Sequence, residues 1–197
     1  MVNLIPPNGR PRNEIFVSDR ICKVTQRVAN QTRDSPRLSA KGGSKIALQY
    51  QENGHVTLPE TTPGKPANRG TVYVYGTSEP REDDSLLSIH KVWDTAGKGG
   101  NKRGKLLNTF DFDDGKCYQI NQGDISRLRQ RRFGPRADPI MGAELWCRNI
   151  VSLPVGLPTD TLYALYWVWD WPTGRISNGS LNAKTEIYTT CIDVEII

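Results

Sequence analysis

Glycine and proline interrupt this chain too often for it to be built from long helices. Its 197 residues include 18 glycines and 13 prolines, so about one residue in six is of a type that bends or ends regular structure. No Gly-X-Y period and no heptad run is present, which excludes collagen-like and coiled-coil folds. We therefore expect short elements joined by many turns.

The apolar pattern of these short segments has the period of β-strands. In residues 45–51, Ile46, Leu48 and Tyr50 alternate with polar or small residues, which predicts a half-buried strand. The segment 161–169 is apolar on both faces and predicts a central strand with packing above and below it. Further short strands are expected at 71–75, 106–112, 117–120, 144–151 and 184–194.

The remaining segments predict loops, with residues 1–44 as a loop-rich part that holds one helical turn at 19–28. Together these patterns predict a single all-β domain over residues 1–197. The expected architecture is an antiparallel β-sandwich, immunoglobulin- or fibronectin-like, with long loops and one or two short helices.

Four cysteines are spread over the whole chain, at positions 22, 117, 147 and 191, and none has the C-x-x-C spacing of a zinc ribbon. Two long-range disulfides fit this spacing, and four buried thiols are the alternative. Two glycosylation sequons, at Asn30 and Asn178, also favour an extracellular protein. Residues 1–10 have no signal peptide, and no apolar run is long enough to cross a bilayer.

The net charge of +5 is concentrated in residues 121–137, which hold five arginines and one acid. Asp124 is expected to N-cap a short helix there, docked through Ile125 and Leu128 with the arginines in solvent. An anionic-ligand site is the alternative to a solvated helix face. Phe133 is the only aromatic residue in the segment, so we expect no nucleic-acid partner.

Only two histidines, His55 and His90, are available for catalysis or metal binding. Neither adjoins a nucleophile-elbow sequence, and no His-x-x-x-His pair exists, so hydrolase and zinc sites are weakly supported. The carboxylates of residues 111–115 lack calcium-loop spacing and indicate a hairpin turn. His55 follows a predicted strand and a glycine, so its ring should project from a loop held by a sheet.

Several blocks of the sequence resemble lytic polysaccharide monooxygenases. Residues 46–76, with His55 between two strands, are similar to the stretch around that family's second copper histidine. The segment 186–191, Glu-Ile-Tyr-Thr-Thr-Cys, resembles the closing Gln-x-Tyr-x-x-Cys strand of the family. The blocks at 115–118, 141–147 and 166–172 resemble a secreted fungal group of monooxygenase-like proteins.

The resemblance implies a copper site. His55 would be a ring-nitrogen ligand, Tyr188 the axial group, and Glu186 would replace the glutamine that helps position the oxygen species. It also implies the disulfides Cys22–Cys191 and Cys117–Cys147. The substrate would be an extracellular polysaccharide such as chitin or cellulose, oxidised at a carbon of the glycosidic bond with electrons from an external reductant. We expect the protein to be a monomer and to have no membrane partner.

One ligand of the family's histidine brace is missing from the sequence. The family's first histidine, at the mature N-terminus, has no counterpart here, because no histidine precedes His55. We therefore expect that the first strand of the fold and this histidine are lacking, and that the chain as written is inactive. The alternative is a non-catalytic carbohydrate- or copper-binding β-sandwich module. Four tryptophans are candidates for stacking on sugars in such a module: Trp93, Trp167, Trp169 and Trp171. Of these, we expect Trp167 and Trp169 to lie in the core.

Overall fold

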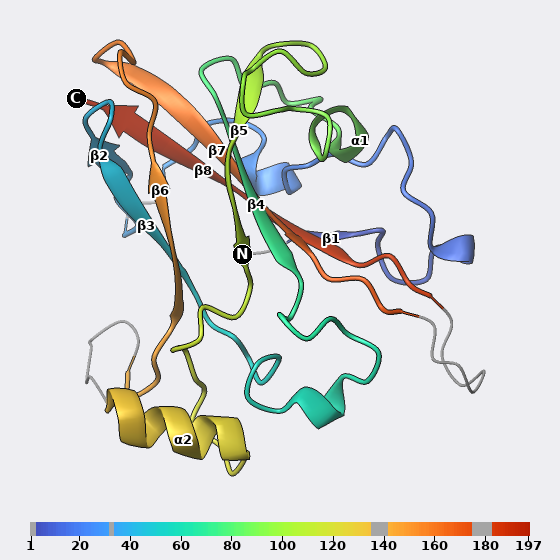
Figure 1. Cartoon of the computed structure of the whole chain (residues 1–197). Coiled ribbons are helices and arrows are strands. Elements are labelled where there is room, and N and C mark those ends of the chain that lie inside the picture. Colours follow the sequence, from blue (N-terminus) through green and yellow to red (C-terminus); the bar gives the residue numbers. More distant parts are fainter. Residues whose placement is uncertain (1–2, 32–33, 135–141, 175–182) are drawn as a thin grey trace.

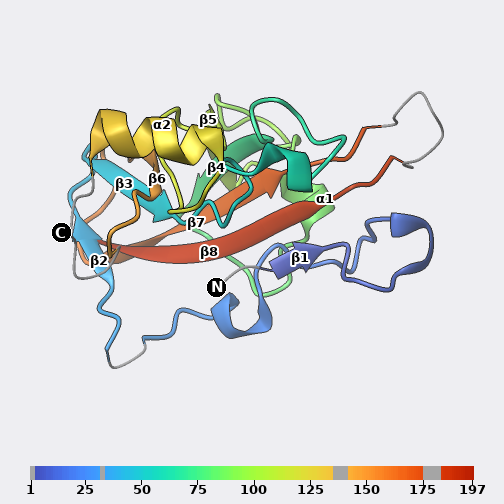
Figure 2. The same ribbon diagram turned by 90° about the horizontal axis from the view of Figure 1, so that it is seen from below.

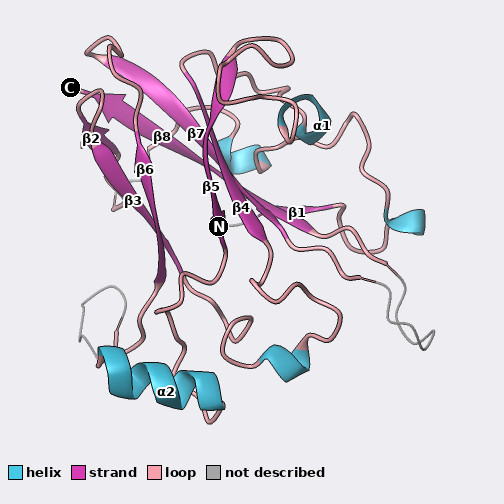
Figure 3. Ribbon diagram, in the orientation of Figure 1, coloured by secondary structure: helices cyan, strands magenta, loops and turns pink. Residues whose placement is uncertain are grey.

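The protein is an all-β fold whose described residues form two sheets with mainly antiparallel pairing, long loops and two α-helices (Figures 1 and 3). The computed structural model describes residues 3–31, 34–134, 142–174 and 183–197. Its strands are β1 (Asn3–Ile5), β2 (Leu38–Ala40), β3 (Lys45–Tyr50), β4 (Thr71–Thr77), β5 (Gly104–Asp111), β6 (Cys147–Ser152), β7 (Thr161–Asp170) and β8 (Ile187–Ile196). Its helices are α1 (Leu86–Ile89) and α2 (Asp124–Phe133), with short 3-10 helices η1 (Pro11–Asn13), η2 (Val24–Gln26) and η3 (Pro59–Thr61).

The larger sheet has the strand order β1-β8-β7-β4-β5, and β2 adds to it by pairing with β8. The β2–β8 pairing is parallel and the others in this sheet are antiparallel. Strands β3 and β6 form a separate antiparallel pair. This pair lies over one face of the larger sheet, as the view in Figure 2 shows, so the predicted sandwich-like architecture is confirmed.

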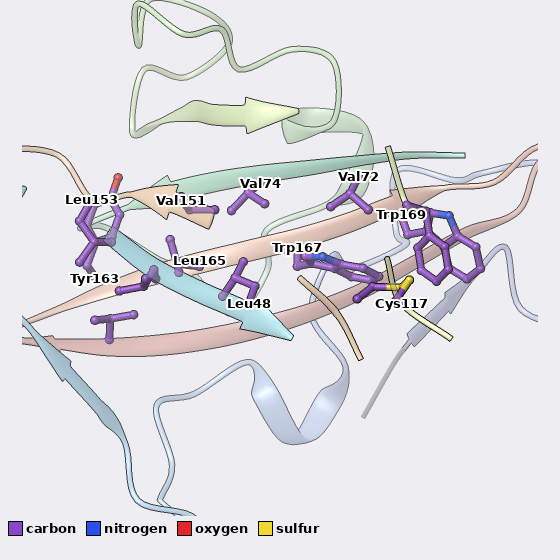
Figure 4. Packing of buried hydrophobic residues seen from close by; sticks show 14 of the residues in the cluster. Leu48, Val72, Val74, Cys117, Val151, Leu153, Tyr163, Leu165, Trp167 and Trp169 are labelled. Atoms are coloured by element: carbon purple, nitrogen blue, oxygen red, sulfur yellow. A yellow bond between two sulfur atoms is a disulfide. The ribbon is translucent and has the colours of Figure 1, made fainter. Parts of the chain in front are cut away.

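Strand β7 is central and buried on both faces, as its sequence predicts. Along it, Leu165 and Trp167 belong to the core between the two sheets, whereas Tyr166 and Val168 belong to a second core on the opposite face. This alternation follows from the period-two geometry of a strand. Figure 4 shows the first core, in which Trp167 and Trp169 pack beside the sulfur of Cys117.

Most predicted strands are present, with shifts of a few residues at their ends. The strand expected at 117–120 is absent, and Tyr118 forms only an isolated bridge with Leu145. Residues 1–44 contain two short strands that the sequence did not predict, since both β1 and β2 pair with β8. The helical turn expected at 19–28 is the shorter η2.

Helix α2 is present, but it docks through polar residues. Its N-cap is Gly123, and Asp124 is its first residue. The prediction that Leu128 docks the helix is wrong, because this side chain is 57% exposed and Ser126 is buried in its place. Arg129 also faces inward and donates to the carboxylate of Asp113 at 2.7 and 2.8 Å, so not all of the arginines are in solvent.

Both disulfides implied by the resemblance are formed, which excludes four free thiols. Cys22 bonds to Cys191 and links the N-terminal loop to β8. Cys117 bonds to Cys147 and links the segment before α2 to the start of β6. In the part of the chain that the structure describes, no helix is both long and apolar enough to cross a membrane.

Candidate functional site

The loop that carries His55 is held by a buried carboxylate at its first turn. Glu52 is only 2% exposed, and one of its oxygens accepts hydrogen bonds from the backbone amides of Val56 and Thr57. The other accepts from the Thr57 hydroxyl and from the amide of Gln119. Because a buried carboxylate needs such partners, Glu52 fixes the loop of His55 to the segment that leads into α2.

The His55 ring packs against two tryptophans at the end of β7. Its centroid lies 4.6 Å from Trp171, in an edge-on arrangement, and 5.5 Å from Trp169. Burial lowers the pKa of His55 below its ordinary value, so the imidazole is neutral at neutral pH. A neutral ring nitrogen is the form that a metal requires.

The same two tryptophans contact Tyr188 at the start of β8. Tyr188 stacks on Trp169 at 5.1 Å between ring centroids and is 6.3 Å from Trp171. The structure thereby brings together His55 and Tyr188, which the sequence analysis placed in one site. Within the described residues, the contact between them runs through the tryptophans, since no direct ring contact joins the two side chains.

Glu186 is the centre of a buried polar network. Tyr188 donates its hydroxyl proton to Oε1 of Glu186 at 2.6 Å. Lys65 Nζ donates to Oε2 at 2.7 Å and also to the carbonyl of Trp171 at 2.7 Å. This ammonium lies 3.7 Å from the centroid of the Trp171 ring, in cation–π geometry. Lys184, whose side chain is more exposed, is 3.3 Å from the same Oε2 atom.

The network sets the protonation of its members. Burial acts to raise the pKa of Glu186, but hydrogen bonds from Lys65 and Tyr188 outweigh it and hold the pKa below its ordinary value. Burial and then the carboxylate of Glu186 raise the pKa of Tyr188, so the phenol keeps its proton. Burial lowers the pKa of Lys65, and the Glu186 carboxylate opposes that effect. Glu186 is therefore a carboxylate at neutral pH.

These residues do not by themselves form a copper site. They supply one neutral imidazole and one phenol whose proton is donated to Glu186, and tight Cu(II) binding needs more nitrogen donors. Among the described residues, the one group of three potential metal ligands is Asp114, Cys117 and Cys147. Both of its sulfurs are bonded to each other, so this group does not fit copper either.

Several other candidates lie away from the site or are occupied. His90 is on the opposite face of the larger sheet, where it contacts Tyr73 at 4.8 Å and bonds to the Tyr75 hydroxyl. In the 111–115 segment, Asp113 and Asp114 accept backbone amides in a turn that follows β5. Asn30 is exposed, whereas its sequon partner at 32 and the second sequon residue, Asn178, lie outside the described residues.

The four tryptophans named as sugar-stacking candidates are all buried, with exposures between 2% and 5%: Trp93, Trp167, Trp169 and Trp171. The expectation that two of them lie in the core is confirmed. The other two are core residues as well. None of the four presents a ring face on which a sugar can stack without rearrangement.

Sequence reasoning missed Lys65 and Glu52. Lys65 lies in a Pro- and Gly-rich loop with no period, and its partner Glu186 is 121 residues away. Glu52 had one usable signal, because a single acid immediately after an apolar strand and before a glycine turn is a candidate to accept the amides of that turn.

Comparison with known proteins gives a family and no named relative. No curated protein matches the chain, and no solved structure matches it. One family model matches, and it covers residues 1–197. With the whole chain inside that match, the protein belongs to the family described as a domain of unknown function, DUF7492.

Proposed function

We propose that the protein is a lytic polysaccharide monooxygenase-like β-sandwich that acts on or binds an extracellular polysaccharide such as chitin or cellulose. His55 would supply a ring nitrogen to copper, with Tyr188 at the axial position and Glu186 beside it. One observation carries the proposal: His55 and the Glu186–Tyr188 pair, which are far apart in the sequence, meet around Trp169 and Trp171. The two disulfides support an extracellular location.

Copper binding by this chain alone should be weak, because His55 is the one imidazole at the site. On the resemblance, the further nitrogens belong to the amino group and ring of an N-terminal histidine. Calorimetric copper titration should therefore compare the chain with a form extended by a segment that begins with histidine. The extension should raise the affinity, and His55→Ala should remove the gain.

His90→Gln is the matched control, since this histidine lies on the other face of the sheet. It should leave the gain intact. The proposal fails if the extension adds no affinity, or if His55→Ala and His90→Gln lower the affinity equally. Nitrogen hyperfine lines in the Cu(II) electron paramagnetic resonance spectrum provide a second measure of how many rings bind.

A second candidate is a binding module without redox chemistry. It is favoured by the closed network at Glu186, in which the Tyr188 proton and the Lys65 ammonium are both engaged with the carboxylate. Pull-down on insoluble chitin and cellulose, followed by product analysis with copper and an external reductant, separates the two functions. Binding without oxidised sugars supports the module, and oxidised sugars support the monooxygenase.

A further inference from the structure

Helix α2 presents an outward face of arginines that form no ion pair with any acid among the described residues. Its inward side is defined by Ser126, which is fully buried, and by Arg129 and Gln130, which donate to Asp113 and Ser126 respectively. With 3.6 residues per turn, the opposite side consists of residues 124, 127, 128, 131 and 132. Leu128 lies at the middle of this side and is 57% exposed.

The three outward arginines differ from the inward one in their partners. Arg127 donates to the amide oxygen of Gln122, and Arg132 lies over the ring of Phe133. Within the ranges that the structure describes, neither these two nor Arg131 forms an ion pair, whereas Arg129 does. The only acid on the outward side of the helix is Asp124, so this face carries a net positive charge that can attract an anion.

The segment that leads into α2 is bonded to the loop that carries His55. Asn121, two residues before the N-cap of α2, donates to the Thr57 hydroxyl at 2.7 Å, and the amide of Gln119 donates to Glu52 in the loop of His55. Figures 1 and 2 both place α2 beside the loop that follows β3. Helix α2 therefore lies on the side of the molecule where the loop of His55 is anchored.

The chemistry of this surface favours an anionic polymer over a neutral one. Neutral glycans are held largely by stacking on exposed aromatic faces, and the four tryptophans considered above are buried. Guanidinium groups pair with carboxylates through two parallel hydrogen bonds, and a polyuronate repeats a carboxylate on every sugar. We propose that the outward face of α2 binds an anionic, uronate-type polysaccharide through Arg127, Arg131 and Arg132. This inference rests on the proposed function only in taking a polysaccharide as the ligand.

The test is the affinity of the protein for polygalacturonate, measured by calorimetry at low and at moderate salt. The matched ligand is the same polymer with its carboxylates methyl-esterified, which keeps the sugars and removes the charge. Binding should be restricted to the free acid and should weaken as salt screens the arginines. Replacing Arg127, Arg131 and Arg132 together by Gln should weaken it by about tenfold, the combined effect of three exposed ion pairs of ordinary strength.

The matched protein control changes Lys98 and Lys102 to Gln, because these exposed lysines follow α1 in the loops before β5, at the far end of the sheet from α2 in Figure 1. Their loss should change the affinity less than about twofold. An equal loss in the control, equal binding of the methyl ester, or tighter binding to duplex DNA than to the polyuronate would overturn the inference. Each helix substitution is on the surface, and an unchanged circular dichroism spectrum checks that the variants fold.

This experiment is independent of copper. With copper removed by a chelator, polyuronate binding by the wild-type protein should be unchanged. Polymer binding lost only in the arginine variant, together with no effect of an added N-terminal histidine on copper, would support the helix surface and refute the copper site. Polymer binding that the arginine variant retains, together with a gain in copper affinity from the added histidine, would refute the helix surface alone.

Discussion

Replacing Lys65 by methionine should destabilise the protein more than its position in an irregular loop suggests. The Lys65 side chain is 7% exposed and that of Glu186 is 11% exposed, and their charged atoms are 2.7 Å apart. Removal of one partner from a buried ion pair typically costs about 3–5 kcal/mol, because the other charge stays buried. Here Glu186 keeps the Tyr188 hydroxyl and the nearby Lys184, so we expect a loss of about 2–3 kcal/mol in the free energy of unfolding.

Two further variants separate the ion pair from general loss of packing. Lys184→Met removes a lysine that is 3.3 Å from the same carboxylate but has a 47% exposed side chain, so its cost should stay below about 1 kcal/mol. In the double variant Lys65→Met with Glu186→Gln, no buried unpaired charge remains, because Lys184 is largely exposed, and stability should return to within about 1 kcal/mol of the wild type. Methionine keeps much of the apolar stem of lysine, which limits packing changes.

The stability cost of Lys65→Met should depend on pH. The folded-state pKa of Glu186 is depressed, so its ionised form contributes stability that is present above its unfolded pKa of about 4.3 and is lost as the pH falls through the lower folded pKa. The cost of Lys65→Met should therefore be large at about pH 7 and shrink toward about pH 3. Urea unfolding with the disulfides intact, monitored by tryptophan fluorescence, measures the cost at each of the two pH values. A cost that is absent at neutral pH, or that does not shrink in acid, would refute this account.

Two more changes probe the framework of the site by urea denaturation. Glu52→Gln places an amide NH₂ among four donors, so it should cost about 2–4 kcal/mol; a cost below about 1 kcal/mol would mean that the loop of His55 is held by something else. Removing the Cys22–Cys191 bond by a double alanine substitution should cost more than removing Cys117–Cys147. The sequence separations are 169 and 30 residues, and loop-closure entropy then predicts about 5 against about 4 kcal/mol; the opposite order would contradict the entropic argument.

The sequence predicts the strands whose burial has a clear period. Strand β3 alternates because only one of its faces meets the larger sheet, and β7 is apolar throughout because both of its faces are covered. Strands β1 and β2 have three residues each, which is too short for a period to show. Their place is decided by β8, whose free edge accepts them at its two ends.

Helix α2 forms where the sequence predicts a helix, but it docks through a different side than the sequence indicates. The spacing of Ile125 and Leu128 indicated an apolar contact, but the helix packs where Ser126 and Arg129 find polar partners on the preceding segment. Buried polar groups are tolerated when each is hydrogen-bonded. Those partners are fixed by the Cys117–Cys147 bond and the turn around Asp113, which a helical period does not reveal.

The charge around Glu186 acts in opposite ways on the two proposed ligands, copper and an anionic polysaccharide. Lys65 and Lys184 surround one carboxylate, Glu186, so the network next to Tyr188 carries an excess of one positive charge. That excess opposes a metal cation that has only one imidazole, and it would have to be overcome by further neutral nitrogen donors. The same excess would attract the polyanion that we propose, as would the arginines of α2, which form no ion pair within the described residues. Glutamate at position 186 keeps this balance at one positive charge, because glutamine there would leave both lysines unneutralised.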